Sequence, residues 1–592
     1  MTLNPFTREL LQNALASIAD GMIVSVLRTS RSTIVKNNLD FSSAICDAEG
    51  NQVAQGLALP GHLGAIMPAL KGCLDYFGDD IQPGDILASN DPYAGGSHLN
   101  DIFMYKPIHA TTGELIAFLC LILHHTDMGG RVAGGQATDS TEIFQEGLRI
   151  PPSKIQEGDR LNTMLLRIIE KNVRVPSQVL ADIRAQISAL NFGGREVAKL
   201  LGDYEVAEFR AYMADMIDYS ERLTRAGIKA LPDGEAEFTE WIDDYGVPGT
   251  PPLKIHIRLV IKGEEISVDY AGTSPQITGA LNTNFAFTIS CTYAAVRTAL
   301  DPAIPNNAGF YRAIKVSAPE GSFVNVRFPA ALGARGQGGY RIRTVVLGAL
   351  AQLLPERMTA CPGGSDFSLA LAGGNQGREP FLFVESHVVT GHGAGVDRDG
   401  QEGGPYCLGN VANVPVEVLE SENPVRIEEY GFLPDTGGPG KHRGALGVVR
   451  QYRLLADEAT VQVRSDRQTF QPWGLFGGRP SAPPRLVLNP ATDAKILPSK
   501  FVRILKGGDV LRAEMAGSGG YGDPFERDPQ EVLEDIRQGK VTPDHAQEAY
   551  GVVIDGDSTK VDREATDRLR DQAKGKAGQD EVPPALQHRQ PR

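Results

Sequence analysis

The sequence has no closely spaced cysteines and no basic run. Its six cysteines form no Cys-x-x-Cys pair; they are Cys46, Cys73, Cys120, Cys291, Cys361 and Cys407. This spacing excludes a zinc finger or an iron–sulfur site and argues against a disulfide framework. The formal net charge is -15. Because binding to phosphates needs clustered Lys and Arg, nucleic acid is excluded as the main partner.

Targeting and nucleotide-binding segments are also missing. No uncharged apolar stretch reaches about 18 residues, and the N-terminus "MTLNPFTREL" lacks the basic and apolar regions of a signal peptide. We therefore expect a cytoplasmic protein without a membrane partner. Neither Gly-x-x-x-x-Gly-Lys-Ser/Thr nor a strand-borne Gly-x-Gly-x-x-Gly is present. If ATP is used, we expect another chain to bind it.

The patterns that are present predict an α+β protein with several layers, in which a β-rich body carries a helical insert and a small helical C-terminal segment. The 66 glycines of the chain recur in pairs beside polar residues, which indicates tight turns between strands. The expected divisions are an N-terminal α/β metal-binding region at 1–155, a helical layer at 156–235, a β-rich body with inserted helices at 236–525, short C-terminal helices at 526–563 and a disordered tail at 564–592.

Within these divisions, periodicity predicts individual elements. Apolar residues at fourfold spacing predict a first helix over 7–28. The run "LIAFLCLILHH" predicts a strand buried on both faces. The helical patterns of 156–230 are interrupted at Pro176 and at Gly193-Gly194. "TVVLGALAQLL" predicts a helix inside the β-rich body, after the Gly-rich stretch "GARGQGGYR".

The stretch "NDPYAGGSHLNDIFMYKP" and the following "LILHHTDMGG" gather three histidines among 11 in the whole chain. His98 and Asp101 lie three apart after a glycine turn, so both can point to one side. His124 and His125 end the predicted strand and should face opposite ways, which favours His124 over His125 beside them. Imidazole and carboxylate groups from several elements are typical ligands of divalent transition metals.

Each part of this constellation has an ordinary explanation as well. A His-x-x-Asp pair recurs by chance in long proteins, and a His-His pair at a strand end is often a core or surface feature. Asp40 in "NNLDFSSAI" would by itself be read as a satisfied edge or turn residue. Spacing alone therefore leaves metal binding and a structural role open.

Several long motifs resemble the hydantoinase B family. They include "LDFSSAICDAEGNQVAQ", "PGHLGAIMPAL", "PGDILASNDPYAGGSHLNDI", "HHTDMGG", "QEGLRIPP", "YAGTSPQITGALNT", "PWGLFGG" and "GSGGYGDP", in order from about residue 7 to 555. The family contains the B-type chain of N-methylhydantoinase, the C-terminal half of 5-oxoprolinase and the corresponding subunits of caprolactamase and of acetone and acetophenone carboxylases. The resemblance implies a site for zinc or manganese, with Asp40, His98, Asp101 and His124 as ligands.

The resemblance also implies a reaction. An A-type partner subunit with an actin-like ATPase fold, in a hetero-tetramer with this chain, would use ATP to phosphorylate a hydantoin, 5-oxoproline or a lactam. This chain would complete ring opening at its metal by activating water. Either His125 or Asp127 would serve as general base or orienting residue. The alternatives are a subunit of an ATP-dependent ketone carboxylase and a non-catalytic scaffold of such a complex.

The sequence departs from the family pattern in two places. Relatives read Lys-Glu-Arg before the "LDFS" acid, where this chain has Asn37 and Asn38, and a Gly-Asn-x-Glu-Thr-Ser-Gln stretch where it has "GARGQGGYRIRT". Arg335 and Arg341 in that second stretch could hold a phosphate, although capping or pairing is the commoner use of such arginines. Glu146 in "QEGLRIPP" is a candidate to support the metal ligands.

Overall fold

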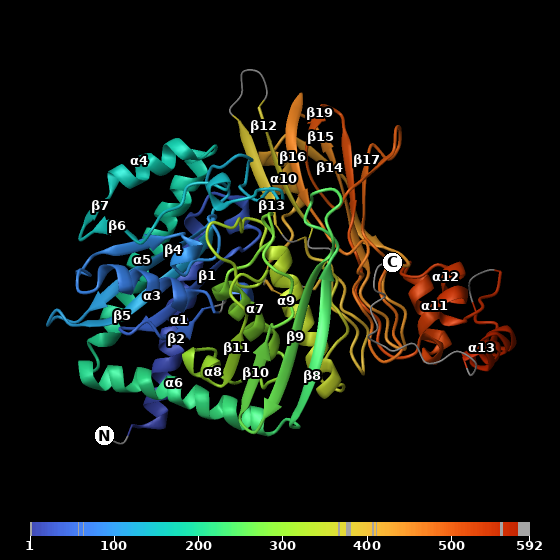
Figure 1. The fold of residues 1–592 in the computed structure, drawn as a ribbon, viewed down its shortest axis with the longest axis horizontal. Helices are drawn as coiled ribbons and strands as arrows, with labels where there is room; N and C mark the ends of the chain where they lie inside the picture. The colour runs from blue at the N-terminus through green and yellow to red at the C-terminus, as the bar shows by residue number, and fades with distance from the viewer. Residues whose placement is uncertain are drawn as a thin grey trace.

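The computed structural model describes residues 3–56, 59–62, 64–364, 367–374, 380–386, 388–404, 408–409, 411–556 and 560–577. Figure 1 shows an N-terminal layer at one side, a middle layer beside it, and a pair of sheets that lead to C-terminal helices at the far side. This is the α+β, multi-layer arrangement expected from the sequence. Cys407 lies outside the described residues.

The N-terminal layer is built on a seven-stranded sheet in the order β2-β1-β5-β4-β3-β6-β7. Its strands are β1 (Phe41–Asp47), β2 (Gln52–Gln55), β3 (Ile86–Ser89), β4 (Asp101–His109), β5 (Leu115–His124), β6 (Ser153–Glu157) and β7 (Arg160–Leu161). Short 3-10 turns accompany it at η1 (Pro60–His62), η2 (Pro92–Ala94) and η3 (Ile143–Gln145). Every neighbouring pair of strands is antiparallel.

Helices cover both faces of this sheet. On β5, alternate residues such as Leu119 and Leu121 face α1 (Pro5–Thr29) and α5 (Pro176–Leu201), whereas Phe118 and Cys120 face α3 (Ile66–Phe77). The expected strand buried on both faces is confirmed. Because both faces are covered, the strand is apolar without alternation, and its polar residues fall at its end.

The first helix is the one among the described residues that is long and apolar enough to cross a membrane. Its side chains Leu11, Leu15, Met22 and Val26 are buried in the core of the N-terminal layer. Length and composition of this kind are shared by core helices.

The helical layer consists of α2 (Thr33–Lys36), α4 (Thr163–Asn172), α5 and α6 (Val206–Lys229). Pro176 is the first residue of α5, as a helix start requires. Gly193 and Gly194 do not interrupt α5, contrary to the expectation. A Cβ on Gly193 would lie 2.7 Å from the sulfur of Met22, so this glycine serves close packing against α1.

The middle layer is a four-stranded sheet in the order β11-β10-β9-β8 packed against helices. Its elements are β8 (Gly234–Ile242), β9 (Leu253–Lys262), β10 (Glu265–Asp269), α7 (Phe285–Arg297), α8 (Ala308–Arg312), β11 (Ile314–Ser317) and α9 (Gly336–Leu353). The predicted apolar helix is α9, but it begins earlier than expected and takes in most of the Gly-rich stretch. A Cβ on Gly339 would lie 2.5 Å from the ring of Phe287, so the glycines let α9 and α7 pack closely.

Two further sheets share a core of their own. One has the order β13-β12-β16-β19 and the other β14-β15-β20-β17-β18. Their strands, with one helix, are β12 (Ser368–Gly373), β13 (Phe381–Glu385), α10 (Val416–Glu422), β14 (Val425–Leu433), β15 (Gly447–Leu454), β16 (Glu458–Arg464), β17 (Arg485–Leu488), β18 (Lys495–Leu497), β19 (Lys500–Lys506) and β20 (Val510–Glu514). The segment expected as one β-rich body thus forms two layers with separate cores.

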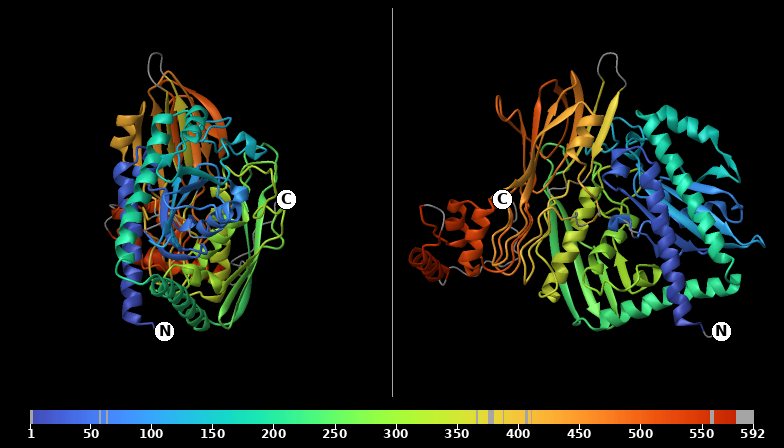
Figure 2. Two further views of the ribbon diagram at one scale, coloured as in Figure 1. Left: turned by 90° about the vertical axis from the view of Figure 1, so that its left-hand side faces the viewer. Right: turned by 180° about the vertical axis from the view of Figure 1, so that it is seen from behind.

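The C-terminal helices form a small unit at one end of the molecule, well away from α1 and α6 (Figure 2). They are η4 (Pro524–Glu526), α11 (Pro529–Arg537), α12 (Pro543–Tyr550) and α13 (Arg563–Ala577). The short helices expected at 526–563 are present. The tail expected to be disordered from 564 instead begins with α13, and 578–592 lie outside the described residues.

Candidate functional site

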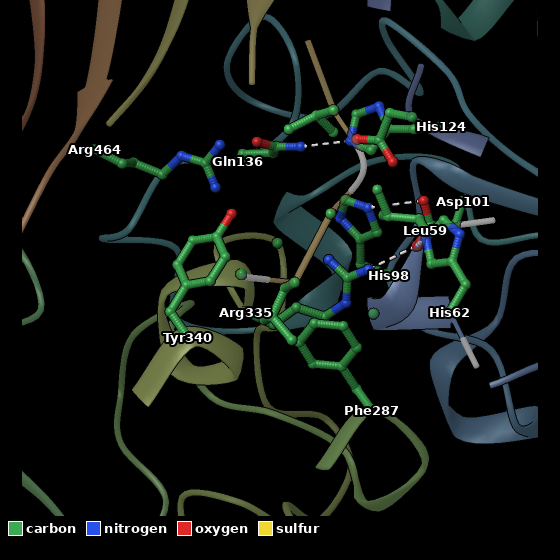
Figure 3. Close-up of a pocket in the computed structure, with 17 residues that line it drawn as sticks. Leu59, His62, His98, Asp101, His124, Gln136, Phe287, Arg335, Tyr340 and Arg464 are labelled. Atoms are coloured by element: carbon green, nitrogen blue, oxygen red, sulfur yellow. Dashed lines mark hydrogen bonds and ion pairs between the residues drawn. The ribbon is translucent and has the colours of Figure 1, made fainter. Parts of the chain in front are cut away.

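A pocket lies where the N-terminal sheet meets the middle layer and the end of β16 (Figure 3). The pocket is partly enclosed and partly open to solvent. Its lining combines polar side chains with the apolar residues Leu59, Phe287, Leu408 and Val411. A small, mostly buried pocket with a few convergent polar groups is the usual form of a ligand site.

Strand pairing brings Asp101 and His124 together. They are direct partners in the antiparallel ladder of β4 and β5, so their side chains stand on the same face. His98 joins them from the turn before β4, where the Asp101 N–H donates to the His98 carbonyl at 3.0 Å. Just before it, Gly95 ends η2 with φ +93°, packed against the backbone of Pro68. Ligand-type atoms of the three side chains all lie within 4.8 Å of one another.

Asp40 lines the same pocket from the residue before β1. Its carbonyl accepts the N–H of His124 at 3.1 Å, so its backbone is fixed to the end of β5. Burial, and next to it the charge of Asp101, raises the pKa of Asp40 to about 8. A cation bound between the carboxylates would reverse this shift, because it favours the ionised form. Asp40 is not part of the tight group formed by the other three side chains.

The arrangement of His98 and Asp101 fits a metal ion. His98 Nε2 lies 3.3 Å from Asp101 Oδ1, and neither atom has a hydrogen-bond partner among the described residues. Burial lowers the pKa of His98, which favours its neutral form. Against the cost of burial, the charge of Arg335 holds the pKa of Asp101 well below its usual value. A divalent cation bound between these two buried ligand atoms would satisfy both of them.

Arg335 holds the other oxygen of Asp101. Its Nη2 donates to Asp101 Oδ2 at 2.6 Å and its Nε donates to Ser97 Oγ at 2.7 Å. The guanidinium lies 4.3 Å from the ring centre of Phe287. Arg335 thus lines the pocket. The sequence left open whether this arginine binds a phosphate or forms an ion pair. It pairs with a carboxylate, and this leaves Oδ1 as the oxygen directed at the histidines.

The sequence did not single out His62 or Gln136, which also line the pocket. His62 Nδ1 lies 2.9 Å from Ser42 Oγ, and its Nε2 lies 4.0 Å from Asp101 Oδ2. Burial lowers the pKa of His62 to about 4. Gln136 Nε2 lies 2.8 Å from His124 Nε2. For His62, the sequence offered one signal of a functional role, its position between two glycines in the motif "PGHLGAIMPAL".

His125 and Asp127 lie outside this pocket, in contrast to the catalytic roles expected for them. Strand alternation turns His125 to the opposite face, where its Nε2 lies 3.1 Å from Gln186 Oε1 on α5. Asp127 accepts the backbone N–H of Arg174 at 2.6 Å and its guanidinium at 3.0 Å. Both side chains therefore connect the end of β5 to the helical layer, and this geometry gives them no access to a substrate in the pocket.

Two other candidates have structural partners. Arg341 pairs with the buried Asp466 and donates to the carbonyl of Trp241, away from the pocket. Glu146 Oε1 accepts the N–H groups of Leu332 and Gly333 at 2.8 and 2.6 Å. Gly333 lines the pocket, so Glu146 fixes the backbone segment that leads to Arg335. It does not contact a candidate metal ligand directly.

The departure at Asn38 has a visible use. Its Nδ2 donates to the carbonyl of Ala412 at 2.7 Å, and its own carbonyl accepts the N–H of Ala412 at 3.2 Å. The neighbouring Val411 lines the pocket. Asn38 therefore joins the segment that carries Asp40 to the segment that carries Val411.

Convergent histidine, carboxylate and guanidinium groups in such a pocket are typical of an enzyme active site. The family model described as Hydantoinase B/oxoprolinase matches residues 4–524. The chain belongs to the hydantoinase B/oxoprolinase family, and the resemblance read from its motifs is confirmed. Hydantoinases, oxoprolinases and caprolactamases are hydrolases of cyclic amides.

Individual relatives agree with this assignment. The chain is 32% identical to the beta subunit of the caprolactamase of Pseudomonas jessenii, over 95% of this chain and 98% of that protein. It is 30% identical to the B-type chain of a putative D-/L-hydantoinase of a Pseudomonas species, over 96% of this chain and 98% of the relative. Both relatives are named as one subunit of an enzyme, which implies a partner subunit.

Solved structures share the fold. The crystal structure of the ATP-dependent caprolactamase from Pseudomonas jessenii matches with a TM-score of 0.91 at 31% identity, over 96% of this chain and all of that chain. Nucleotide-free acetone carboxylase matches with a TM-score of 0.92, over 98% of this chain and 84% of that chain. Its identity is 20%, so this second likeness concerns the fold alone.

Proposed function

We propose that this chain is the metal-dependent B-type subunit of a cytoplasmic, ATP-dependent amidohydrolase that opens a hydantoin, 5-oxoproline or a lactam. The observation that carries the proposal is the buried group of His98, Asp101 and His124, whose ligand atoms lie close together. In this group, His98 Nε2 and Asp101 Oδ1 have no hydrogen-bond partner among the described residues. A scaffold would gain nothing from this arrangement, because unpartnered buried polar atoms cost free energy.

His98, Asp101 and His124 would hold the metal, with Asp40 as a fourth ligand from the facing segment. Two imidazoles and two carboxylates suit zinc or manganese. When bound, such an ion polarises a carbonyl and makes water acidic enough to be deprotonated near neutral pH. Arg335 keeps one oxygen of Asp101 occupied, so that the carboxylate offers the other oxygen in a fixed direction.

The rest of the pocket would bind the ring. Leu59, Phe287, Leu408 and Val411 form a wall against which the methylene groups of a lactam or hydantoin can pack. The same wall limits the access of water to the polar side of the pocket, which strengthens the electrostatic interactions there.

ATP would be bound by a partner. The chain has neither of the common glycine-rich phosphate-binding motifs, whereas the similar caprolactamase is ATP-dependent. We propose an A-type partner subunit with an actin-like ATPase fold, in a hetero-tetramer, that phosphorylates the cyclic amide before this chain completes ring opening. A carboxylase subunit is the second candidate, but its support is a likeness of fold at 20% identity.

The test is ring opening by the assembled enzyme. The purified chain and its A-type partner should open at least one of hydantoin, 5-oxoproline and caprolactam with ATP and metal, and neither chain should do so alone. Asp101→Asn should abolish ring opening while phosphate release from ATP persists. Asp269→Asn, at the half-buried end of β10 and outside the pocket, is the matched control and should behave as the wild type. Bicarbonate-dependent carboxylation of a ketone, without ring opening, would favour the carboxylase instead.

A further inference from the structure

His62 is fixed in the wall of the pocket by a buried serine. The residue is 2% exposed and is the last of the turn η1, whose Gly61 N–H donates to the Leu408 carbonyl at 2.8 Å. Ser42, on β1, lies behind the imidazole with its Oγ 2.9 Å from Nδ1. Neither residue belongs to the ligand group of His98, Asp101 and His124.

The hydroxyl of Ser42 determines which nitrogen of His62 carries the hydrogen. Ser42 Oγ accepts the backbone N–H of Leu59 at 3.0 Å. Within the described part of the chain, His62 Nδ1 is then the one acceptor available for the Ser42 hydroxyl hydrogen. A buried hydroxyl donates when an acceptor is in reach, because an unpaired buried donor costs free energy. Nδ1 therefore accepts, and the hydrogen of the neutral ring is on Nε2.

The Nε2–H of His62 is left without an acceptor. Asp101 Oδ2 is 4.0 Å away, beyond hydrogen-bond distance, and already accepts from Arg335 at 2.6 Å. No described residue accepts from Nε2, and the imidazole lines the pocket. A donor that lines the pocket beside a carboxylate that is already paired points to an acceptor supplied by a ligand.

We propose that His62 donates its Nε2–H to an oxygen of the bound substrate and acts as a neutral donor whose tautomer Ser42 fixes. The proposal rests on the function proposed above. That oxygen is the carbonyl oxygen on the carbon that water attacks, either in the cyclic amide or in the acyl phosphate that remains once the ring nitrogen of the phosphorylated amide has left. Negative charge grows on this oxygen as the new C–O bond forms, so the hydrogen bond strengthens in the transition state. His62 neither gains nor loses a proton in this step.

Substitutions in the assembled enzyme separate a donor from a base. His62→Leu removes the donor and should lower kcat by about 100-fold or more, with metal content unchanged. His62→Gln places an amide N–H near the position of Nε2 and should restore at least about a tenth of the wild-type kcat, with the pH profile of the wild type. His256→Leu is the control, since His256 Nδ1 also lies 2.9 Å from a hydroxyl, that of Thr239, on another sheet.

Several outcomes would overturn the proposal. Full kcat in His62→Leu would show that His62 does not contact the reacting oxygen. A His62→Gln enzyme as slow as His62→Leu would show a proton-transfer role, and metal loss from His62→Leu would make His62 a ligand. If the wild-type enzyme opens no ring, the proposed function fails, but the tautomer can still be tested. The ¹⁵N NMR spectrum of histidine-labelled protein, with His62 assigned from its absence in His62→Gln, should show Nε2–H; an Nδ1–H tautomer would refute the assignment.

Discussion

Asp101 and His124 are directly paired residues of two adjacent antiparallel strands, so the carboxylate and the imidazole project from the same face of the sheet. His124 is in turn tied through its backbone N–H to the carbonyl of Asp40 at 3.1 Å. Strand register, rather than a flexible loop, thus sets the spacing of these groups. A shift of the register by one residue would place them on opposite faces and destroy the site.

The first prediction concerns metal binding. His98→Ala should lose most of the roughly one divalent transition metal ion expected per chain, because it removes one of few ligands and the remaining groups cannot replace it. Elemental analysis of purified protein measures the effect. His109→Ala is the matched control, since His109 lies at the other end of β4 and outside the pocket. Equal metal content in both variants would refute the metal site.

The second prediction concerns the ion pair between Arg335 and Asp101. Arg335→Leu leaves a buried carboxylate without its guanidinium and should lower the free energy of unfolding of the metal-free protein by about 3 kcal/mol. Urea unfolding at neutral pH is the measurement. Arg327→Leu, which breaks the exposed pair with Glu320, should cost less than about 1 kcal/mol. An equal, small effect in both variants would mean that the buried pair contributes little.

The third prediction concerns Asp127, which the sequence placed in catalysis and the structure places against Arg174. Asp127→Asn should destabilise the protein by about 1–3 kcal/mol, because the amide cannot replace both charge-assisted hydrogen bonds. Metal content and the kcat of the folded fraction should remain. A loss of kcat without a loss of stability would instead support the catalytic role.

The site could be predicted from the sequence where local rules apply. His98 and Asp101 share a short turn, and strand alternation separates His124 from His125, so spacing was enough to place these side chains. The apolar run before His124 identified the buried strand. The same rules place His125 on the opposite face, and nothing in its spacing required a role in the pocket.

The remaining parts of the site could not be found in this way. Arg335 reaches Asp101 across 234 residues of sequence, and only the packing of the middle layer against the N-terminal layer, as between α7 and η1, brings them together. The glycines before Tyr340 suggested a loop, because glycine disfavours helices, but the ring of Phe287 leaves no room for a side chain at Gly339 inside α9. His62 and Ser42 gave no periodic signal that could connect a hydroxyl to an imidazole.

The last prediction uses the buried carboxyl of Glu146. Burial raises its pKa from 4.5 to about 8, although the N–H groups of Gly333 and Leu332 act in the opposite direction. Between these two pH values the folded protein holds a proton that the unfolded chain releases. The contribution of this group to stability is therefore complete below about pH 4.5 and is lost as the pH rises towards 8.

Glu146→Gln removes this dependence but keeps an oxygen that can accept the two N–H groups. The variant should therefore gain stability relative to the wild type as the pH is raised from about 5 to about 8, and the difference should level off above that range. Thermal or urea unfolding of both proteins at each pH measures it, with the exposed Glu320→Gln as the control that should follow the wild-type curve. A constant difference between Glu146→Gln and wild type across this range would show that Glu146 is ionised in the folded protein, and that the backbone hydrogen bonds at Leu332 and Gly333 outweigh its burial.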